Sequence, residues 1–181
     1  LFPYTTLFRS AFPRSQRSSG VRGCRNHLQR LCGAQENTMK HELRTYRTET
    51  GWDTPLPSTL DSPLTLVLAF AAPEFGTAPA PLAELAAAFP QSVIIGCSTA
   101  GEIAGTLVHD TSISVAVARF EHTQLRRAIT PVASAADSFA AGQRLAAQLT
   151  APDLRAVFVL SDGLCVNGTP LVAALTQHLP A

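Results

Sequence analysis

The chain has 181 residues, of which 46% are hydrophobic and 15% charged, and its net charge is +1. This length fits one domain of ordinary size, and the hydrophobic fraction excludes a wholly disordered chain. Four cysteines are too few for a disulfide scaffold. The longest nearly apolar run, residues 64–72, is much shorter than the ~20 residues that a membrane-spanning helix needs. The sequence therefore predicts a globular chain without a membrane span.

The basic residues are concentrated at the N-terminus. Residues 1–38 hold six Arg and one acidic residue, whereas the remainder holds 8 basic and 12 acidic residues. Because the remainder is mildly acidic, no nucleic-acid partner is expected.

The leader does not have the pattern of a folded segment. Its first ten residues, LFPYTTLFRS, resemble the conceptual translation of a widely used sequencing adapter. Residues 11–38 show neither a two-residue nor a 3.6-residue hydrophobic period. We interpret residues 1–38 as a non-native or disordered leader, made of adapter and upstream translation. The alternative is an organellar transit peptide, which is also Arg-rich and poor in acidic residues.

Residues 39–181 form the body, and its first half alternates between strands and a helix. A short strand or extended arm is expected around Glu42–Thr48. Leu64–Phe70 (LTLVLAF) is nearly all apolar, which predicts a buried strand, and Ser92–Cys97 (SVIIGC) predicts a second one. Between them, Pro81–Phe89 is Ala-rich and is followed by a proline, which predicts a helix. These three elements predict a right-handed βαβ unit.

The second half of the body begins with two strands. Ser112–Phe120 alternates between apolar and small residues, and a short polar link joins it to Gln124–Val132. A link this short predicts that the two strands are antiparallel neighbours. Ser134–Leu149 is apolar on one face and predicts a helix, with Ser134 as N-cap and Asp137 three residues later.

The chain closes with another strand and helix. Arg155–Leu160 (RAVFVL) predicts a buried strand, and the final helix is expected to begin at a capping Thr169 and to end near His178. The element order predicts an α/β fold with one mixed parallel and antiparallel sheet and helices packed on it. Because the last helix needs a strand to receive it, we expect residues 39–181 to be a partial domain, incomplete at its C-terminus.

Small, polar and glycine residues follow two of the predicted strands, in GCSTAGEI at 96–103 and SDGLCVNG at 161–168. In mixed α/β sheets, ligands bind beyond the carboxyl ends of parallel strands, so these two loops are expected to enclose one cleft. The helix start after the second loop offers N–H groups to an anion, and Glu102 and Asp162 offer carboxylates to a cation. A zwitterion such as an amino acid would use both. The expected ligand contacts are Ser98, Thr99, Gly101, Glu102, Ser161, Asp162, Gly163, Asn167 and Gly168.

A structural interpretation stands beside this one. Ser-Asp-Gly and Asn-Gly sequences form turns, so Asp162 would only make an Asx-turn. In the same interpretation, Thr99 or Glu102 would only satisfy amide groups of the loop.

The two loop motifs, together with the strand and helix before them, closely resemble the N-terminal half of the FIST domain family, from about Leu64 to Ala181. Members of this family are intracellular sensory domains of bacterial signal-transduction proteins. The resemblance implies a cytoplasmic, non-catalytic domain that binds a small molecule such as an amino acid. It also implies a signalling output domain or kinase as partner. Relatives often carry Asn where this chain has Cys165.

Some relatives bind haem and sense nitric oxide, and this is the second function that the resemblance implies. An axial haem ligand is most often His, Cys, Met or Tyr. The candidates in the body are His41, His109, His122, His178, Cys97 and Cys165, and no spacing selects one of them. No metal is expected, because Cys24 and Cys32 lie in the leader and no CxxC of zinc spacing occurs.

The third function considered is that of a serine hydrolase. GCSTA at 96–100 resembles a nucleophile elbow, and Ser98, Asp162 and His178 follow the order nucleophile, acid and base. An elbow needs a helix directly after the serine, and the glycines that follow Ser98 disfavour one. The predicted last helix also separates His178 from Asp162 by about 15 Å. We therefore expect no catalytic residue.

Overall fold

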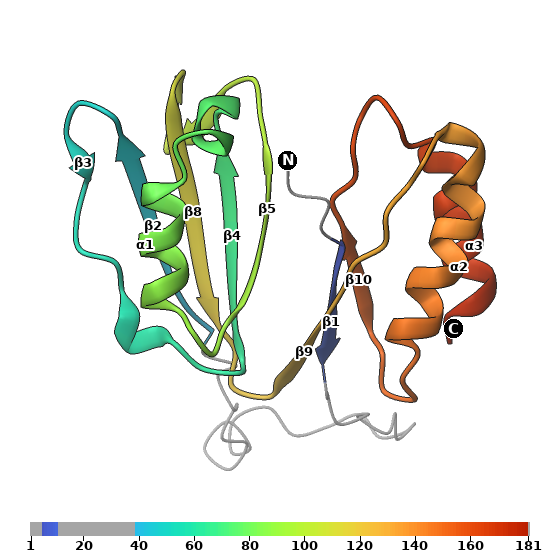
Figure 1. The fold of residues 1–181 in the computed structure, drawn as a ribbon. Coiled ribbons are helices and arrows are strands. Elements are labelled where there is room, and N and C mark those ends of the chain that lie inside the picture. The colour runs from blue at the N-terminus through green and yellow to red at the C-terminus, as the bar shows by residue number, and fades with distance from the viewer. Residues whose placement is uncertain (1–4, 11–38, 181) are drawn as a thin grey trace, which may run out of the picture.

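The computed structural model describes residues 5–10 and 39–180 (Figure 1). Within these residues the α-helices are α1 (Ala80–Ala88), α2 (Ser138–Leu149) and α3 (Gly168–His178). The strands are β1 (Thr5–Ser10), β2 (Lys40–Arg47), β3 (Gly51–Trp52), β4 (Thr65–Ala71), β5 (Val93–Ser98), β6 (Glu102–Ala104), β7 (Leu107–His109), β8 (Ser112–Arg119), β9 (Thr123–Ala128) and β10 (Ala156–Val159). Short 3-10 turns lie at Ser58–Leu60, Pro73–Gly76 and Ala135–Asp137.

Five strands form the larger sheet, in the order β3-β2-β8-β4-β5. β4 and β5 are parallel and joined by α1, so the predicted βαβ unit is confirmed. β8 lies between β2 and β4 and is antiparallel to both. The sheet is therefore mixed, as predicted.

Alternation along these strands builds the first hydrophobic core. Val67 on β4 and Val115 on β8 are each at most 1% exposed, and Leu85 and Phe89 from α1 and its C-terminal end pack in the same cluster. Because side chains of a strand alternate between the two faces, the sequence places its β-branched residues on the face that α1 covers.

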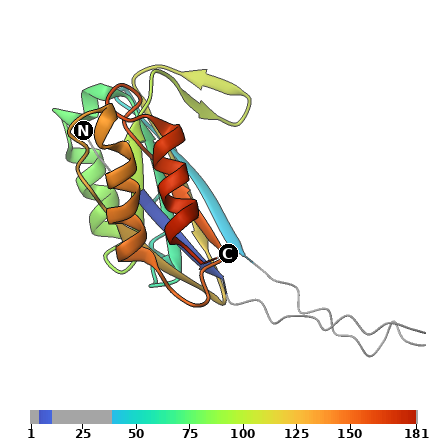
Figure 2. The ribbon, with the colours of Figure 1, turned by 90° about the vertical axis from the view of Figure 1, so that its right-hand side faces the viewer.

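A smaller sheet holds three strands in the order β10-β1-β9. α2 and α3 lie side by side against it (Figures 1 and 2). A second core lies between these helices and the sheet, with Ala128, Leu145, Leu149, Leu171 and Leu175 buried in it. No helix of the described part is long and apolar enough to cross a membrane.

The prediction that the strands now called β8 and β9 are antiparallel neighbours is wrong, and so is the prediction of a single sheet. Both edges of β8 are hydrogen-bonded, one to β2 and the other to β4. Since β8 has no free edge, β9 continues away from it and pairs with β1 in the smaller sheet. The short link joins two sheets instead of closing a hairpin.

β1 belongs to the segment that we predicted to be a non-native or disordered leader. It is antiparallel to both of its neighbours, pairing Thr5 with Ala128 on β9 and with Val159 on β10. The rest of that prediction falls on residues 1–4 and 11–38, which lie outside the described residues. The origin of the leader stays a prediction.

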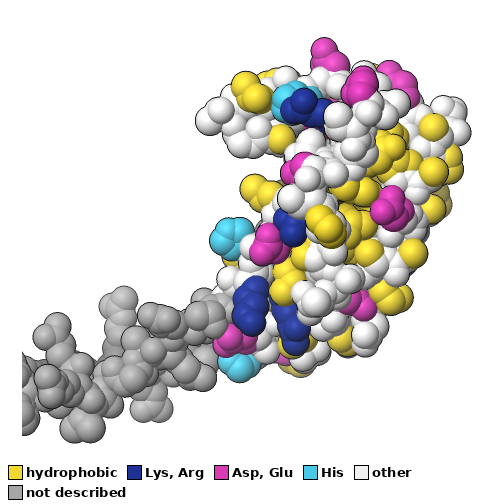
Figure 3. Space-filling model, turned by 90° about the vertical axis from the view of Figure 1, so that its left-hand side faces the viewer, with side chains coloured by type: hydrophobic (Ala, Val, Ile, Leu, Met, Phe, Trp, Pro, Cys, Tyr) yellow, Lys and Arg dark blue, Asp and Glu magenta, His cyan; other side chains and the backbone are white. Residues whose placement is uncertain are grey.

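The β6–β7 hairpin was not predicted. Its turn is Gly105-Thr106, and the φ of +63° at Gly105 is the conformation that two-residue hairpin turns favour at this position. Three large apolar side chains on it are more than half exposed: Ile103, Leu107 and Val108. The hairpin projects from the body beside the larger sheet (Figures 2 and 3). Each strand has three residues, which is too short for hydrophobic alternation to show.

The predicted helix starts needed correction. α2 begins at Ser138 after the 3-10 turn, and Ser134 makes no capping hydrogen bond with its side chain. α3 is capped by Asn167, whose side chain accepts from the Thr169 backbone N–H, so Thr169 is not the cap. β10 was predicted to be buried, but its residues are half-buried or exposed because it is an edge strand of the smaller sheet.

Candidate functional site

The loop after β5 is organised around the buried carboxylate of Glu102, which is 1% exposed. One carboxylate oxygen accepts from the Thr99 hydroxyl at 2.7 Å. The other accepts from the Ser112 hydroxyl at 2.9 Å and from the Ser112 backbone N–H at 3.2 Å. Three donors therefore hold Glu102, in agreement with the structural interpretation of this residue.

The other predicted contacts of this loop lie around that carboxylate. Ser98 is exposed at the end of β5, and the Thr99 backbone N–H donates to the Ala71 carbonyl oxygen at 3.0 Å. A Cβ atom at Gly101 would lie 3.1 Å from the Val108 side chain. The small residue at Gly101 therefore lets the loop pass close to the β6–β7 hairpin.

The loop after β10 is closed by Asp162. Its carboxylate accepts from the backbone N–H groups of Leu164 at 2.7 Å and of Cys165 at 2.9 Å. The hydrogen bonds from Cys165 and then Leu164 lower the pKa of Asp162, because they stabilise the ionised carboxylate. This is the Asx-turn of the structural interpretation.

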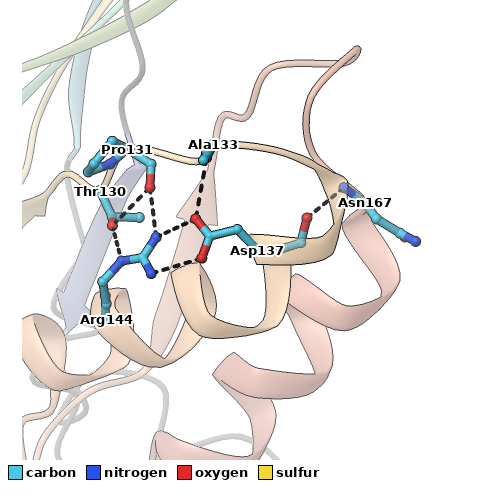
Figure 4. Close-up of polar contacts among 7 residues, drawn as sticks. Thr130, Pro131, Ala133, Asp137, Arg144 and Asn167 are labelled. Atoms are coloured by element: carbon cyan, nitrogen blue, oxygen red, sulfur yellow. Dashed lines mark hydrogen bonds and ion pairs between the residues drawn. The ribbon is translucent and has the colours of Figure 1, made fainter.

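The same loop is joined to both helices of the smaller sheet. The Asn167 side chain accepts from the Thr169 backbone N–H at 3.2 Å. The Asn167 backbone N–H donates to the Ser138 hydroxyl at 2.8 Å, which joins the start of α3 to the start of α2 (Figure 4). Ser161, Gly163 and Gly168 are exposed, and a Cβ atom at either glycine would meet nothing within 4 Å. The exposed end of this loop is therefore open to a ligand.

Both loops lie at the same end of the molecule, one beyond β5 and the other beyond β10 (Figures 1 and 2). Within the first loop the structure brings Thr99 to Glu102. Within the second loop it brings Asp162 to the backbone of residues 164–165, just before Asn167. Among the described residues, no hydrogen bond or ion pair joins one loop to the other.

A cavity of about 870 Å³ lies along β5, which in the described part of the chain pairs with β4 alone. Its walls come from β4, β5, α1, the Pro73–Gly76 turn and one residue of β9. The lining is mainly apolar and includes Phe75, Leu82, Leu85, Phe89, Ile94 and Ile95. A concave, mainly apolar cavity with a few polar groups is the usual form of a small-molecule site.

Three lining residues bring polar or reactive groups to this cavity. Ser98 is the one predicted ligand contact that lines it, and Arg127 is the one charged residue among the described residues that do so. Cys97 lines it as well, and burial raises the pKa of its thiol. Arg127 was missed in the sequence, where the only signal is an arginine pair at 126–127 within an otherwise alternating strand.

A second polar cluster was also missed, at the start of α2 (Figure 4). The Arg144 guanidinium donates to both carboxylate oxygens of Asp137, at 3.1 and 2.9 Å. It also donates to the Thr130 hydroxyl and the Pro131 carbonyl oxygen, each at 2.7 Å. The hydrogen bonds from Arg144 and then from the Ala133 backbone N–H lower the pKa of Asp137. This cluster fixes the segment between β9 and α2.

The comparisons with known proteins identify the family. The family model described as the FIST N domain matches residues 65–181. The chain belongs to the FIST family. The FIST domain is a sensory domain of signal-transduction proteins, and both candidate loops and the cavity lie within the matched residues. Neither the search of curated proteins nor the search of solved structures gave a match.

The haem alternative for this FIST domain requires an axial ligand facing a large apolar space. Of the candidate ligands, Cys97 lines the cavity. Burial raises the pKa of this thiol, so the free cysteine is neutral near pH 7. A cysteine ligand binds haem iron as the thiolate, because the metal displaces the thiol proton. Cys97 is therefore the candidate ligand whose position fits the haem alternative, and haem binding by this domain stays a prediction.

The other candidate haem ligands lie away from the cavity lining. His109 contacts the Arg47 guanidinium, and His122 lies 3.8 Å from the Glu121 carboxylate. His178 is bonded to the Ala174 carbonyl oxygen within α3, while His41 lies on β2 and Cys165 is exposed in its loop. In the described part of the chain, no group of three or more His, Cys, Asp or Glu side chains is placed to hold a metal ion.

The residues of the hydrolase alternative do not form a catalytic set in this FIST domain. Asp162 accepts hydrogen bonds from its own loop, and His178 lies at the opposite end of α3 from that loop. An α-helix of 11 residues spans about 16 Å, so Asp162 does not orient His178.

Proposed function

We propose that this FIST domain senses a small organic acid with an apolar body, such as an amino acid, in the cavity along β5. The cavity is the observation that carries the proposal, because it combines a mainly apolar lining with one arginine. The apolar part of the ligand is buried against α1 and β5, and its carboxylate is bound by Arg127. Arginine is suited to this role because its planar guanidinium donates two parallel hydrogen bonds to a carboxylate.

Ser98 is the second polar contact in this proposal. It lies at the end of β5, where the cavity meets the first candidate loop. The residues from Thr99 to Glu102 and from Ser161 to Gly168 form the rim at that end of the molecule. In this arrangement Glu102 and Asp162 hold the shape of the rim, and the ligand contacts its exposed groups.

The signal passes from the cavity to the helices of the smaller sheet. The ligand contacts β5 on one side and Arg127 of β9 on the other, and these strands belong to different sheets. Binding therefore favours the arrangement of the two sheets that brings Arg127 to the ligand. An output domain or a kinase in the cytoplasm responds to this conformational change.

A binding experiment with paired ligands and paired variants tests this proposal. L-Leucine and L-phenylalanine are compared with their amides, which lack the carboxylate, by isothermal titration and by thermal shift of the full chain. We expect the acids to bind and to raise the melting temperature, because a ligand that binds only the folded state stabilises it. The amides are expected to bind at least about tenfold more weakly, which is about 1.4 kcal/mol.

Arg127→Ala tests the arginine, and Arg126→Ala is its matched control. Arg126 is the preceding residue of β9 and is exposed like Arg127, but it does not line the cavity. We expect Arg127→Ala to lower the affinity for the two acids to the affinity that the wild type has for the amides. Arg126→Ala is expected to leave the affinity for the acids within about twofold of the wild-type value. Equal losses in the two variants would contradict a carboxylate site at Arg127, and no response to any of the four compounds would contradict the proposed ligand class.

A further inference from the structure

The two main sheets share one arrangement of three strands. In the larger sheet, β8 lies between β2 and β4 and is antiparallel to both. In the smaller sheet, β1 lies between β9 and β10 and is antiparallel to both. Helices cover one face of each arrangement, and β4 and β10 each lead to a helix. The central strand position between β9 and β10, which β1 occupies, thus corresponds to the position between β2 and β4, which β8 occupies.

The strands that fill these two positions come from different parts of the chain. β8 follows β5 and the hairpin along the chain, whereas β1 comes from the opposite end of the chain from β9 and β10. Among the described residues, β9 and β10 pair with β1 and with no other strand. The central strand therefore provides every strand-to-strand hydrogen bond of the smaller sheet, and it is not continuous with either neighbour.

The register of β1 with β9 and β10 shows which positions of the central strand face the helices. The position of Thr5 lies opposite Ala128 and Val159, and the position of Leu7 lies opposite Val157. Ala128 is buried in the core beneath α2 and α3, and Val157 and Val159 pack against that core. Directly opposite residues of paired strands share a face, so positions 5 and 7 are on the helix-facing side.

The corresponding strand of the larger sheet has β-branched residues on its helix-facing side. Ile113, Val115 and Val117 of β8 are each at most 1% exposed. Small residues, Ser114 and Ala116, alternate with them on the other face. A strand with this alternation matches a space that has an apolar core on one side only.

We propose that the space between β9 and β10 is a strand-acceptor site. It binds an extended peptide segment, antiparallel to both neighbours, with apolar and preferably β-branched residues on the side that faces α2 and α3. β1 occupies the site and is exchangeable for a segment with the alternation of β8. Such strand addition is a common mode of peptide recognition, in which backbone hydrogen bonds give affinity and alternate side chains give specificity. The site shares β9 with the ligand cavity along β5, because Arg127, which lines the cavity, lies opposite the position of Thr6.

The first test uses a fluorescent peptide with the sequence of residues 112–119, SISVAVAR, and measures its anisotropy with the full chain. Leu7→Pro weakens β1, because proline lacks the N–H that a central strand donates. We expect this variant to bind the peptide at least about tenfold more tightly than the wild type. The control peptide carries V115D and V117D and is expected not to bind. Equal affinity of the wild type and the variant for the peptide overturns the proposal. That result would indicate binding at another place, such as the edge of β5, where the affinity does not depend on β1.

Leu7→Pro can also unfold the smaller sheet, and circular dichroism detects this as a loss of helix. If the variant has lost helix, the peptide is added and the circular dichroism spectrum is measured again. Recovery of the helical signal supports the site, and no recovery at saturating peptide overturns it.

The second test is a matched pair of substitutions in β1, Thr5→Val and Thr6→Val. These neighbours occupy positions on opposite faces of the strand, so the gain in strand propensity is the same for both. The two variants differ in the face, because position 5 lies opposite Ala128 and Val159 on the side of the core and position 6 does not. We expect Thr5→Val to raise the melting temperature by a few degrees and Thr6→Val to leave it unchanged. Equal shifts would overturn the proposed side-chain preference of the site.

Discussion

Ser112 donates both its hydroxyl, at 2.9 Å, and its backbone N–H, at 3.2 Å, to the same carboxylate oxygen of Glu102. The two residues lie at the first positions of β8 and β6, so this contact fixes the hairpin to the larger sheet. A residue predicted to contact ligand is thus a buried structural anchor, and its substitution is expected to change stability.

We predict that Glu102→Ala lowers the free energy of unfolding by about 3 kcal/mol, because it leaves the donors of Ser112 and Thr99 without their acceptor. Glu102→Gln is expected to cost only about 1 kcal/mol, since its amide oxygen still accepts from Ser112 and the Thr99 hydroxyl can turn to accept from its amide nitrogen. Urea unfolding measures both values. Glu49→Gln, at an exposed position, is the control. If both Glu102 variants were as stable as the wild type, Glu102 would not be an anchor.

The ion pair of Asp137 and Arg144 makes a prediction about pH. Hydrogen bonds from Arg144 lower the pKa of Asp137 in the folded state, so the pair stabilises the fold above the ordinary pKa of 3.8. This contribution is lost as the pH falls through the lowered value. We therefore expect Asp137→Asn to be less stable than the wild type near neutral pH, and the difference to shrink below about pH 4.

Urea unfolding at several pH values between about 6 and 2 measures this difference. Asp110→Asn, at an exposed position, controls for the loss of one negative charge. A constant difference between wild type and Asp137→Asn over the whole range would contradict the linkage.

The elements of this fold were largely predictable, because their signals are local. The apolar run at Leu64–Phe70 and the Ala-rich segment at Pro81–Phe89 lie within one residue of β4 and α1. The pairing of β9 was not predictable from a short link, because it depends on whether β8 has a free edge. That edge is taken by β2, a strand about 70 residues earlier in the chain.

The candidate site was predictable only in part. The loops after β5 and β10 lie at one end of the molecule although the two strands belong to different sheets, and the carboxylates of these loops are used within each loop. The cavity could not be predicted, because its apolar walls come from residues that resemble ordinary core residues in the sequence. Arg127 reaches it from a strand of the other sheet, and this depends on how the two sheets are placed.

The contact between α2 and α3 makes a prediction in which two effects oppose each other. Gly142→Ala favours the helix by about 1 kcal/mol through intrinsic propensity. A Cβ atom at this position would lie 2.6 Å from the Leu171 carbonyl oxygen and 2.7 Å from the Ala174 Cβ atom, so the helices must move apart. Overpacking of this kind costs about 1–3 kcal/mol, and we expect a net loss of stability of about 1 kcal/mol.

Gly168→Ala is the matched control, because a Cβ atom there would meet nothing within 4 Å. It is expected to change the free energy of unfolding by less than about 0.5 kcal/mol. A Gly142→Ala variant at least as stable as this control would show that the helices do not pack this closely.

A tryptophan at the wall of the cavity tests its role without changing the polar contacts. Ala86 of α1 lines the cavity, whereas Ala87, the next residue of the same helix, does not, and both are exposed. We expect Ala86→Trp to abolish the binding of L-leucine measured by titration and Ala87→Trp to leave it unchanged. The melting temperatures of the two variants should agree within a few degrees, because neither residue is in the core. Unchanged binding by Ala86→Trp would place the ligand elsewhere.

The two cysteines of the body give a prediction that reports on the same cavity. Burial raises the pKa of Cys97, so a smaller fraction of it is thiolate, whereas Cys165 is exposed in its loop. We expect iodoacetamide to alkylate Cys97 more slowly than Cys165 near pH 8, and the rate at Cys97 to rise as the pH is raised. Mass spectrometry of the labelled peptides measures each site separately. Saturating L-leucine should slow the reaction at Cys97, which lines the cavity, by a larger factor than at Cys165, which lies in the loop after β10. Equal protection of both cysteines would indicate a global change in stability, and protection of neither would argue against a ligand beside β5.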